Sequence, residues 1–145
     1  MLRPLSGPVR DVALLVARVL LGVVLIAHGA QKLFSYGFDG TSGAFAKMGV
    51  PLPQVSAAYA SVVELVGGGL LILGAATTIV SALVVLDMLG ASLTTGSFTS
   101  IFVASHGFEL EGMILVGALL LLVTGAGRFS IDHLLLSRRG AAVTT

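Results

Sequence analysis

The sequence contains no cysteine and no tryptophan, and only 10% of its 145 residues are charged. Without cysteine the chain has no disulfide, thiol relay, iron–sulfur ligand set or covalent haem attachment, because each of these needs sulfur. Any redox chemistry would therefore depend on a bound cofactor, a quinone or a partner subunit. The few charges form no basic cluster and sum to +1, so nucleic acid is not an expected partner.

Apolar residues dominate what is present. Hydrophobic residues make up 56% of the chain, and the mean hydropathy is +1.05. A composition this apolar indicates an integral membrane protein that contacts the lipid bilayer directly. About 20 apolar residues are needed per span. We therefore expect one domain over residues 1–145, with room for four spans and short connections.

Four apolar stretches predict transmembrane helices, over about residues 12–33, 55–75, 79–95 and 109–124. Residues 55–95 form a nearly unbroken apolar tract that would make a helix of ~60 Å, about twice the hydrocarbon thickness. A turn is therefore required, and Gly74 and Thr77 mark its best position. A capping Ser130 predicts a short amphipathic helix over about 130–137.

The placement of arginine predicts the orientation of this bundle. Arg3 and Arg10 precede the first span, while Arg128, Arg138 and Arg139 follow the fourth. The positive-inside rule places such flanks on the cytoplasmic side. The expected fold is therefore an all-α membrane protein, a four-transmembrane-helix bundle with up-down-up-down topology and both termini cytoplasmic.

The first span carries charge where a bilayer favours apolar residues. At ~100° per residue, Gly22 and Lys32 each lie within roughly 40° of Arg18, and His28 lies about 80° to one side of it. A charge inside a membrane costs several kcal/mol unless it is paired or hydrated. This cationic, glycine-notched face should therefore point into the bundle.

Two carboxylates in later spans are candidate partners for Arg18. Helix rise places Arg18 roughly 10 Å from the cytoplasmic boundary and Glu64 and Asp87 at comparable depth. Arg18 is expected to reach Glu64, Asp87 or a point between them, which leaves one carboxylate without a cationic partner. Either this network fixes the packing of the bundle, or the uncompensated carboxylate marks a proton route or a quinone-like head-group site.

A second polar group is predicted at the outer surface, where the fourth span begins. It contains His28, Lys32, His106, Glu109 and Glu111. The two carboxylates suit the positive end of a helix dipole, and a bond from Lys32 to either of them would close an extracytoplasmic pocket. A metal site at His106 is chemically conceivable, but the spacing matches no known motif and no metal is assigned.

Five short motifs occur in order along the chain: Arg18-x-x-x-Gly22, His28-Gly29-x-x-Lys32-Leu33, Glu64 before Gly67-Gly68-Gly69, Gly107-Phe108-Glu109, and Gly125-x-Gly127-Arg128-x-Ser130-x-Asp132. Together they resemble the DoxX family over roughly residues 12–136. The resemblance singles out Arg18, His28, Lys32, Glu64, Glu109 and Asp132, whereas Asp87 and Glu111 enter only through their placement. Many members carry a histidine near the outer end of the third helix, where this chain has Thr94 and Thr95.

The resemblance implies a multi-pass bacterial inner (plasma) membrane protein. Its superfamily includes a subunit of a quinone-linked thiosulfate oxidoreductase and thiol-redox quinone reductases. The resulting hypothesis is a subunit of a membrane redox or oxidative-stress assembly, with a polar pocket for a quinone-like ligand. Its candidate ligand-binding residues are Arg18, His28, Lys32, Glu64, Asp87, Glu109 and Glu111.

Other classes of function stay open. No autonomous catalytic motif is present, so enzyme status is undecided, and other membrane subunits or further copies of the chain are the expected partners. The alternative is an assembly or chaperone-like factor that binds other membrane helices through its glycine-notched face. A proton-coupled transporter is less favoured, because no inverted repeat is visible.

Overall fold

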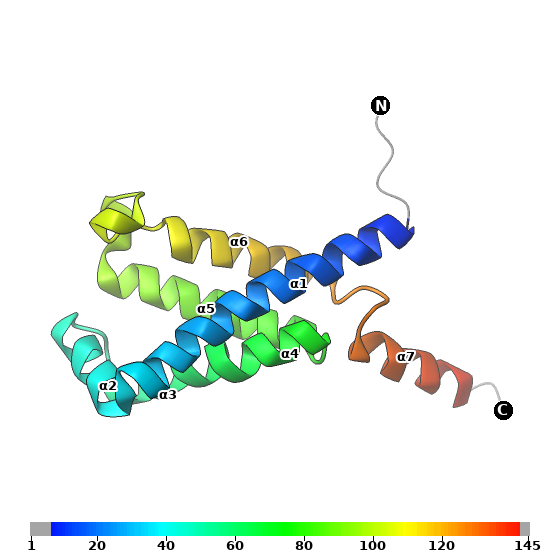
Figure 1. Cartoon of the computed structure of the whole chain (residues 1–145), viewed down its shortest axis with the longest axis horizontal. Coiled ribbons are helices and arrows are strands. Elements are labelled where there is room, and N and C mark those ends of the chain that lie inside the picture. The colour runs from blue at the N-terminus through cyan, green and yellow to red at the C-terminus, as the bar shows by residue number, and fades with distance from the viewer. Residues whose placement is uncertain (1–6, 143–145) are drawn as a thin grey trace.

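The computed structural model describes residues 7–142, and the side chains of residues 7–138. Helices account for most of this part of the chain, and no strand occurs within it. The predicted all-α class is therefore confirmed. The helices form an elongated bundle in which α1 begins and α7 ends at the same end (Figure 1).

The helices are given in chain order with their bounds. They are α1 (Gly7–Ala30), the π-helical η1 (Gln31–Ser35), α2 (Gly37–Lys47), α3 (Pro53–Val62), the π-helical η2 (Val63–Gly67), α4 (Gly68–Leu73), α5 (Thr77–Thr95), α6 (Glu109–Thr124) and α7 (Ile131–Ala142). Two short 3₁₀ turns, Ser97–Thr99 and Val103–Ser105, lie in the α5–α6 loop. α3, η2 and α4 follow one another without a break and form one rod.

Three helical rods are long and apolar enough to cross a membrane: Gly7–Ser35, Pro53–Leu73 and Thr77–Thr95. The first is roughly 43 Å long at ~1.5 Å per residue, so it is tilted in a ~30 Å hydrocarbon layer or projects beyond it. α6 occupies the range expected for the fourth helix but has only 16 residues. Its length of about 24 Å falls short of that layer.

The α4–α5 turn divides the long apolar tract at the expected place. Gly74 and Ala76 both adopt left-handed backbone conformations, with φ of 67° and 49°. Glycine reaches this region without steric cost. A Cβ atom at Gly74 would also overlap the guanidinium of Arg18. Both the backbone conformation and the lack of space therefore favour glycine at this position. α5 begins at Thr77, slightly before the predicted residue 79.

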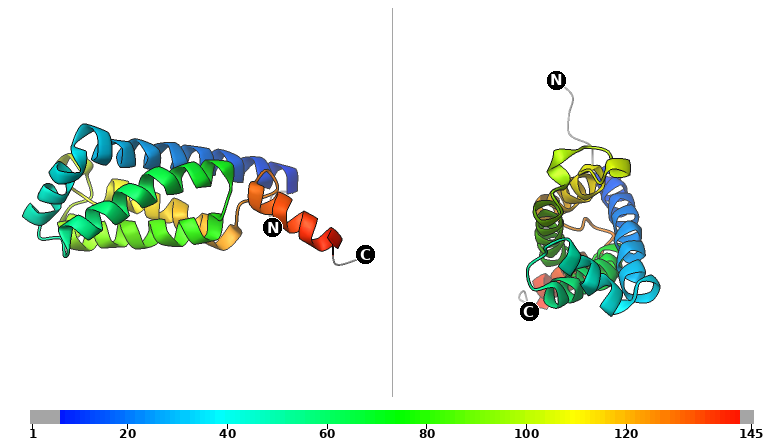
Figure 2. Two further views of the ribbon diagram at one scale, coloured as in Figure 1. Left: turned by 90° about the horizontal axis from the view of Figure 1, so that it is seen from below. Right: turned by 90° about the vertical axis from the view of Figure 1, so that its left-hand side faces the viewer.

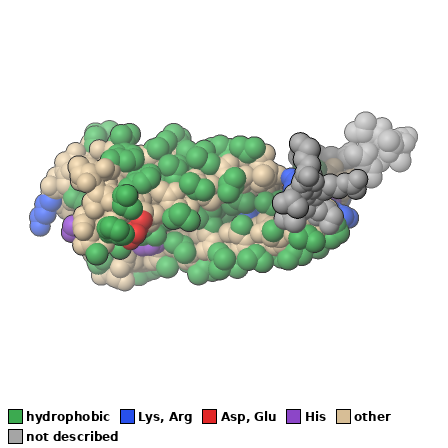
Figure 3. Space-filling view, turned by 90° about the horizontal axis from the view of Figure 1, so that it is seen from above, with side chains coloured by type: hydrophobic (Ala, Val, Ile, Leu, Met, Phe, Trp, Pro, Cys, Tyr) green, Lys and Arg blue, Asp and Glu red, His purple; other side chains and the backbone are tan. Residues whose placement is uncertain are grey.

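Successive long helices run in opposite directions around a small apolar core (Figure 2). α1 packs on η2 and α4, and α5 packs on α6. The core residues include Leu25, Leu71, Val84, Ala118 and Leu121. α2 packs on α3 and defines what we term the α2 end of the bundle, whereas α7 extends from the opposite, α7 end. On the face that Figure 3 shows, hydrophobic side chains are spread over the surface between the ends and charged ones are few, as a surface facing lipid requires.

Glycines allow the backbones of α1 and α4 to touch. A Cβ atom at Gly22 would lie 2.5 Å from the carbonyl oxygen of Gly68, and one at Gly68 would lie 2.7 Å from the carbonyl oxygen of Gly22. Small residues at such crossings are the usual means of close packing in membranes, where no hydrophobic driving force acts between helices. The contact leaves no room for any side chain at either position.

Gly68→Ala is therefore expected to destabilise the protein, by about 1–3 kcal/mol as for other overpacked sites. The measurement is the thermal unfolding midpoint of purified protein in detergent. Gly69→Ala is the matched control, because a Cβ atom at Gly69 meets nothing within 4 Å. The close contact between α1 and α4 would be contradicted if the two variants unfolded at the same temperature.

Candidate functional site

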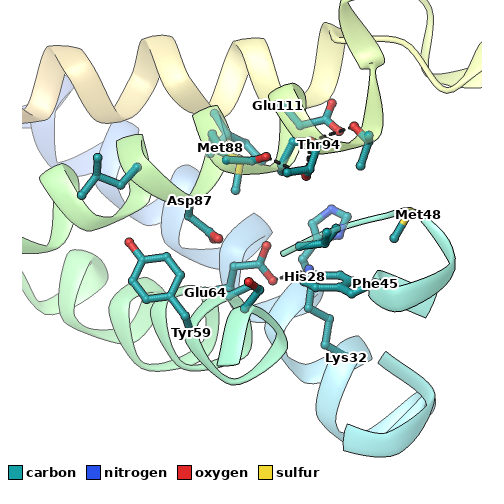
Figure 4. A pocket seen from close by; sticks show the side chains of 18 of the residues that line it. His28, Lys32, Phe45, Met48, Tyr59, Glu64, Asp87, Met88, Thr94 and Glu111 are labelled. Carbon is teal, nitrogen blue, oxygen red and sulfur yellow. Dashed lines mark hydrogen bonds and ion pairs between the residues drawn. The ribbon is translucent and has the colours of Figure 1, made fainter. Parts of the chain in front are cut away.

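A cavity of about 550 Å³ lies between the helices near the α2 end. Its walls come from α1 and η1, α2 and the α2–α3 loop, α3 and η2, α5, and α6. Most of the lining is apolar, with Phe45, Met48 and Ile114 among it. The carboxyl groups of Glu64 and Asp87 point toward one another, and Glu111 lies beside Thr94 (Figure 4). The volume is in the range of pockets that hold small organic ligands.

An ion pair between Lys32 and Glu64 forms one wall of this cavity. The Lys32 Nζ atom donates to the Glu64 Oε2 atom at 2.5 Å, and Glu64 is only 5% exposed. Lys32 lies in the π-helical segment η1, and Glu64 lies in the π-helical segment η2. π-Helical turns inside α-helices often occur at functional sites, because the wider turn redirects side chains. Both members of this pair are redirected in that way.

The predicted pairing of Arg18 with Glu64 or Asp87 is wrong. The prediction placed Arg18 well inside the membrane, whereas the structure places it beside the last turn of α4, at the α7 end. α1 begins earlier than expected and continues through η1, so Lys32 reaches η2 and takes the partner assigned to Arg18. Arg18 does not line the cavity.

Asp87 and Glu111 bring two further carboxyl groups into the cavity from α5 and α6. Asp87 is 7% exposed, and its Oδ2 atom is buried with no hydrogen-bond partner among residues 7–138. The Oε2 atom of Glu111 is buried and unpartnered in the same described part of the chain. A buried polar atom without a partner costs about 1–3 kcal/mol. Both oxygens are enclosed by the surrounding helices, so this cost is built into the packing of α5 and α6.

The other residues predicted to gather at the outer surface lie in different places in the structure. His28 lines the cavity, one helical turn from Lys32. Glu109 lies outside it, and its carboxylate accepts a hydrogen bond from the Val103 backbone N–H at 2.7 Å. His106 is exposed in the α5–α6 loop, with φ of 57°. Within the described residues, no three His, Asp or Glu side chains lie close enough together to hold a metal ion.

The sequence reasoning missed two kinds of lining residue. Phe45, Met48 and Pro51 come from α2 and the loop after it. The glycines and prolines of this segment predict turns, and Phe45 and Met48 could anchor a short interfacial helix, but nothing in the sequence assigns them to a cavity wall. Tyr59 lines the cavity from α3 and donates from its hydroxyl to the Leu83 carbonyl at 2.8 Å. The sequence offers only one indication that Tyr59 has a special place, namely that its phenol is a polar group within an apolar span.

Arg18 belongs to a separate polar cluster at the α7 end. The side chain is fully buried, and it donates hydrogen bonds to the carbonyl oxygens of Phe129 at 2.5 Å and Leu71 at 3.5 Å. Asp132 accepts from the backbone N–H groups of Ala76 and Thr77, at 2.7 and 2.8 Å. It thereby caps the start of α5 from a distant part of the chain. We name this arrangement of Arg18, Asp132 and the α4–α5 turn the tail clasp.

These features define a multi-pass helical membrane protein with a polar interhelical cavity. Residues 13–97 match the family model of DoxX. The chain belongs to the DoxX family. No solved structure gives a significant match to it.

Three relatives cover most of the chain and most of their own length. "Uncharacterized membrane protein Rv3486" of Mycobacterium tuberculosis is 33% identical over 86% of this chain and 82% of its own. "Inner membrane protein YphA" of Escherichia coli is 31% identical, with 88% and 93% covered. "Putative oxidoreductase CatD" of Bacillus subtilis is 30% identical, with 84% and 86% covered. This protein is likewise an inner (plasma) membrane protein, and three of its helical rods are apolar enough to span the bilayer.

Lys32→Met is expected to destabilise the protein by about 3–5 kcal/mol, because it leaves the Glu64 carboxylate buried without its cation. The double variant Lys32→Met/Glu64→Met should recover much of this loss, since both charges are then absent. Thermal unfolding in detergent measures both effects. Lys47→Met, at an exposed lysine of α2, is the control for removing a lysine. A double variant no more stable than Lys32→Met would contradict a buried pair.

Proposed function

We propose that this protein is a membrane subunit of a redox assembly and that its cavity holds the head group of a quinone-type ligand. The observation that carries the proposal is the cavity itself, with Lys32, Glu64, Asp87 and Glu111 set into walls that are otherwise mainly apolar. A quinone has the matching chemistry, because its ring is apolar and its two oxygens are polar. The name of the Bacillus subtilis relative, an oxidoreductase, supports the redox context.

The mouth of the cavity supports an amphiphilic ligand. Val55 and Tyr59 on α3 and Leu86 and Gly90 on α5 line the cavity and are also exposed at the surface of the bundle. These two helices face lipid in a membrane protein of this kind, so an alkyl tail could extend between them into the bilayer while the ring stays inside. An opening toward lipid suits a ligand that reaches the cavity from the bilayer and does not suit a water-soluble substrate.

The rival function is an assembly factor that binds other membrane helices through the glycine-notched face of α1. The structure weakens this candidate, because that face is already filled. Gly22 lies against Gly68, and a Cβ atom at Gly29 would lie 2.5 Å from the backbone nitrogen of Leu65. A partner helix would therefore need another surface. Partner subunits of the redox assembly would also bind elsewhere.

Solvent extraction of protein purified in mild detergent tests the proposed ligand. We expect a quinone in roughly stoichiometric amount, identified by mass spectrometry. Gly90→Phe should abolish its retention, since the new ring would enter the mouth of the cavity, where Gly90 now leaves open space. Gly69→Phe is the matched control, at a glycine outside the cavity that also has open space around it.

Quinone-free wild-type protein that co-purifies with other membrane proteins would count against the ligand site and favour the assembly factor. Equal quinone retention in Gly90→Phe and Gly69→Phe would place any bound quinone outside the cavity.

We further propose four spans in a single domain, with both termini cytoplasmic. Arg10 and Arg128 lie toward the α7 end, as the positive-inside rule requires of the cytoplasmic side. Arg3 and the side chain of Arg139 lie outside the described residues. α6 runs alongside α5 and its 16 residues can cross if flanking residues reach the interfaces or the bilayer thins locally.

Single-cysteine labelling tests this topology without background, because the chain has no cysteine of its own. Thr99→Cys should react with a membrane-impermeant maleimide in intact cells, since it lies in the α5–α6 loop at the α2 end. Thr78→Cys and Ser137→Cys, at the α7 end, should react only after permeabilisation. Labelling of Ser137→Cys in intact cells, with Thr78→Cys protected, would mean that α6 does not cross.

A further inference from the structure

We propose that the α5–α6 loop is a membrane anchor, with an apolar tip embedded at the boundary between head groups and acyl chains at the α2 end of the bundle. The tip consists of Phe98, Ile101, Phe102 and Val103. This interaction surface goes beyond the proposed ligand site and does not depend on which ligand the cavity holds. It rests on the proposed crossing of α6, which the labelling of Ser137→Cys tests separately.

The tip exposes large apolar side chains on a stretch without charge. Phe102 is 67% exposed and Ile101 is 71% exposed. Residues 88–108 contain no Asp, Glu, Lys or Arg. The loop extends beyond α6 on the side away from the other helices (Figures 1 and 2). Its apolar surface therefore continues the lipid-facing surface of the α5–α6 pair, to which the exposed Leu93 belongs.

The height of the loop follows from the opposite end of α6. Arg10 donates to the Thr124 carbonyl at 3.4 Å, and Arg128 follows four residues later. Arginine at the end of a span belongs at head-group level, which sets one boundary of the hydrocarbon layer near Thr124. The 16 residues of α6 extend about 24 Å from there to Glu109, against a layer of ~30 Å. The loop directly beyond Glu109 therefore lies at the second boundary.

Backbone groups of the tip are hydrogen-bonded within the loop, as a position next to hydrocarbon requires. The Glu109 N–H donates across the loop to the Ile101 carbonyl at 2.9 Å, and the Glu109 carboxylate accepts from the Val103 N–H at 2.7 Å. The Phe102 carbonyl accepts from the Gly107 N–H at 2.9 Å. An apolar environment does not cost the tip these bonds, because none of them is made to water.

Close packing holds the tip in this shape. A Cβ atom at Gly107 would overlap the carbonyl carbon of Ile101, so the two sides of the loop touch there. The rings of Phe98 and Phe108 pack with their centroids 4.7 Å apart. A segment that is already ordered loses little conformational freedom when it binds. The tip is therefore preorganised to enter a lipid surface.

The bilayer fits this surface better than a protein partner does. At the height of the loop, lipid already surrounds the exposed sides of α5 and α6, so the bilayer covers the tip without any further component. The exposed polar side chains Thr99, Ser105 and His106 flank the tip in the sequence. The head-group region is hydrated enough to accept them while the rings of the tip reach the acyl chains.

The anchor fixes the height of the cavity mouth. Gly90, which lines the mouth on α5, precedes Thr95 at the end of α5 by five residues, or about 8 Å of helix. With the loop held at the boundary, the mouth opens among the acyl chains just beneath the head groups. A ligand dissolved in the bilayer then reaches the cavity without crossing the head-group layer.

Tryptophan fluorescence tests the anchor without background, because the chain has no tryptophan of its own. Phe102→Trp in lipid nanodiscs should lose roughly half of its emission when the lipids carry bromine near the top of the acyl chain, since interfacial anchors reach ~5–10 Å into that region. Bromine near the end of the chain should quench it less, and the water-soluble quencher acrylamide should have little effect. Lys47→Trp, at an exposed lysine of α2, is the matched control and should respond to acrylamide alone.

Single cysteines give a second measurement in a chain that has none of its own. Phe102→Cys should react with a water-soluble maleimide at least ~10-fold more slowly than Thr99→Cys, because apolar surroundings disfavour the reactive thiolate. Equal rates at the two positions would contradict an embedded tip.

The remaining outcomes separate the alternatives. Quenching of Phe102→Trp by acrylamide, with no effect of brominated lipid, would place the tip in water and overturn the proposal. Protection from both quenchers would overturn it as well, because a protein surface would then cover the tip. Labelling of Ser137→Cys in intact cells would remove the argument from the height of α6, whereas the fluorescence result decides the anchor by itself.

Discussion

The contact between α1 and the η2–α4 segment sets the geometry on which the cavity depends. Gly29 brings the α1 backbone against Leu65, so neither helix can slide or rotate without a clash. Lys32 lies one turn beyond this contact and Glu64 one residue before it, and the fixed alignment therefore brings their charges together. With that wall in place, α5 and α6 close the opposite side. The polar cavity is thus a product of close backbone packing at glycines.

The sequence predicts most of the helices and several of the cavity residues, for reasons that the structure makes plain. Long apolar runs, even when interrupted by glycine, predict membrane helices. His28, Lys32, Glu64, Asp87 and Glu111 were identifiable because a charged or titratable group in an apolar helix needs a polar environment. Composition and burial cost together therefore predicted five of the side chains that line the cavity, while Arg18 and Glu109, predicted on the same grounds, lie outside it.

Which of these groups pair with one another was harder to predict. The depth argument assumed regular helices with ends inferred from the apolar run, and small errors at the ends moved Arg18 by more than a turn. The π-helical turns η1 and η2 have no sequence signature, and they rotate Lys32 and Glu64 relative to an ideal wheel. The apolar part of the cavity, including Phe45 and Met48, gave no signal because apolar residues are ordinary anywhere in such a chain.

The tail clasp has a consequence for biogenesis. Arg18 emerges from the ribosome among the first residues, yet one of the carbonyl oxygens that hold it belongs to Phe129, and the carboxylate that caps α5 belongs to Asp132. Until that late segment is synthesised, a guanidinium and the first amides of α5 remain incompletely satisfied beside the bilayer. The α7 end of the bundle can therefore complete its packing only after the segment that contains Phe129 and Asp132 has been synthesised, which makes the synthesis of this late segment the step that locks the fold.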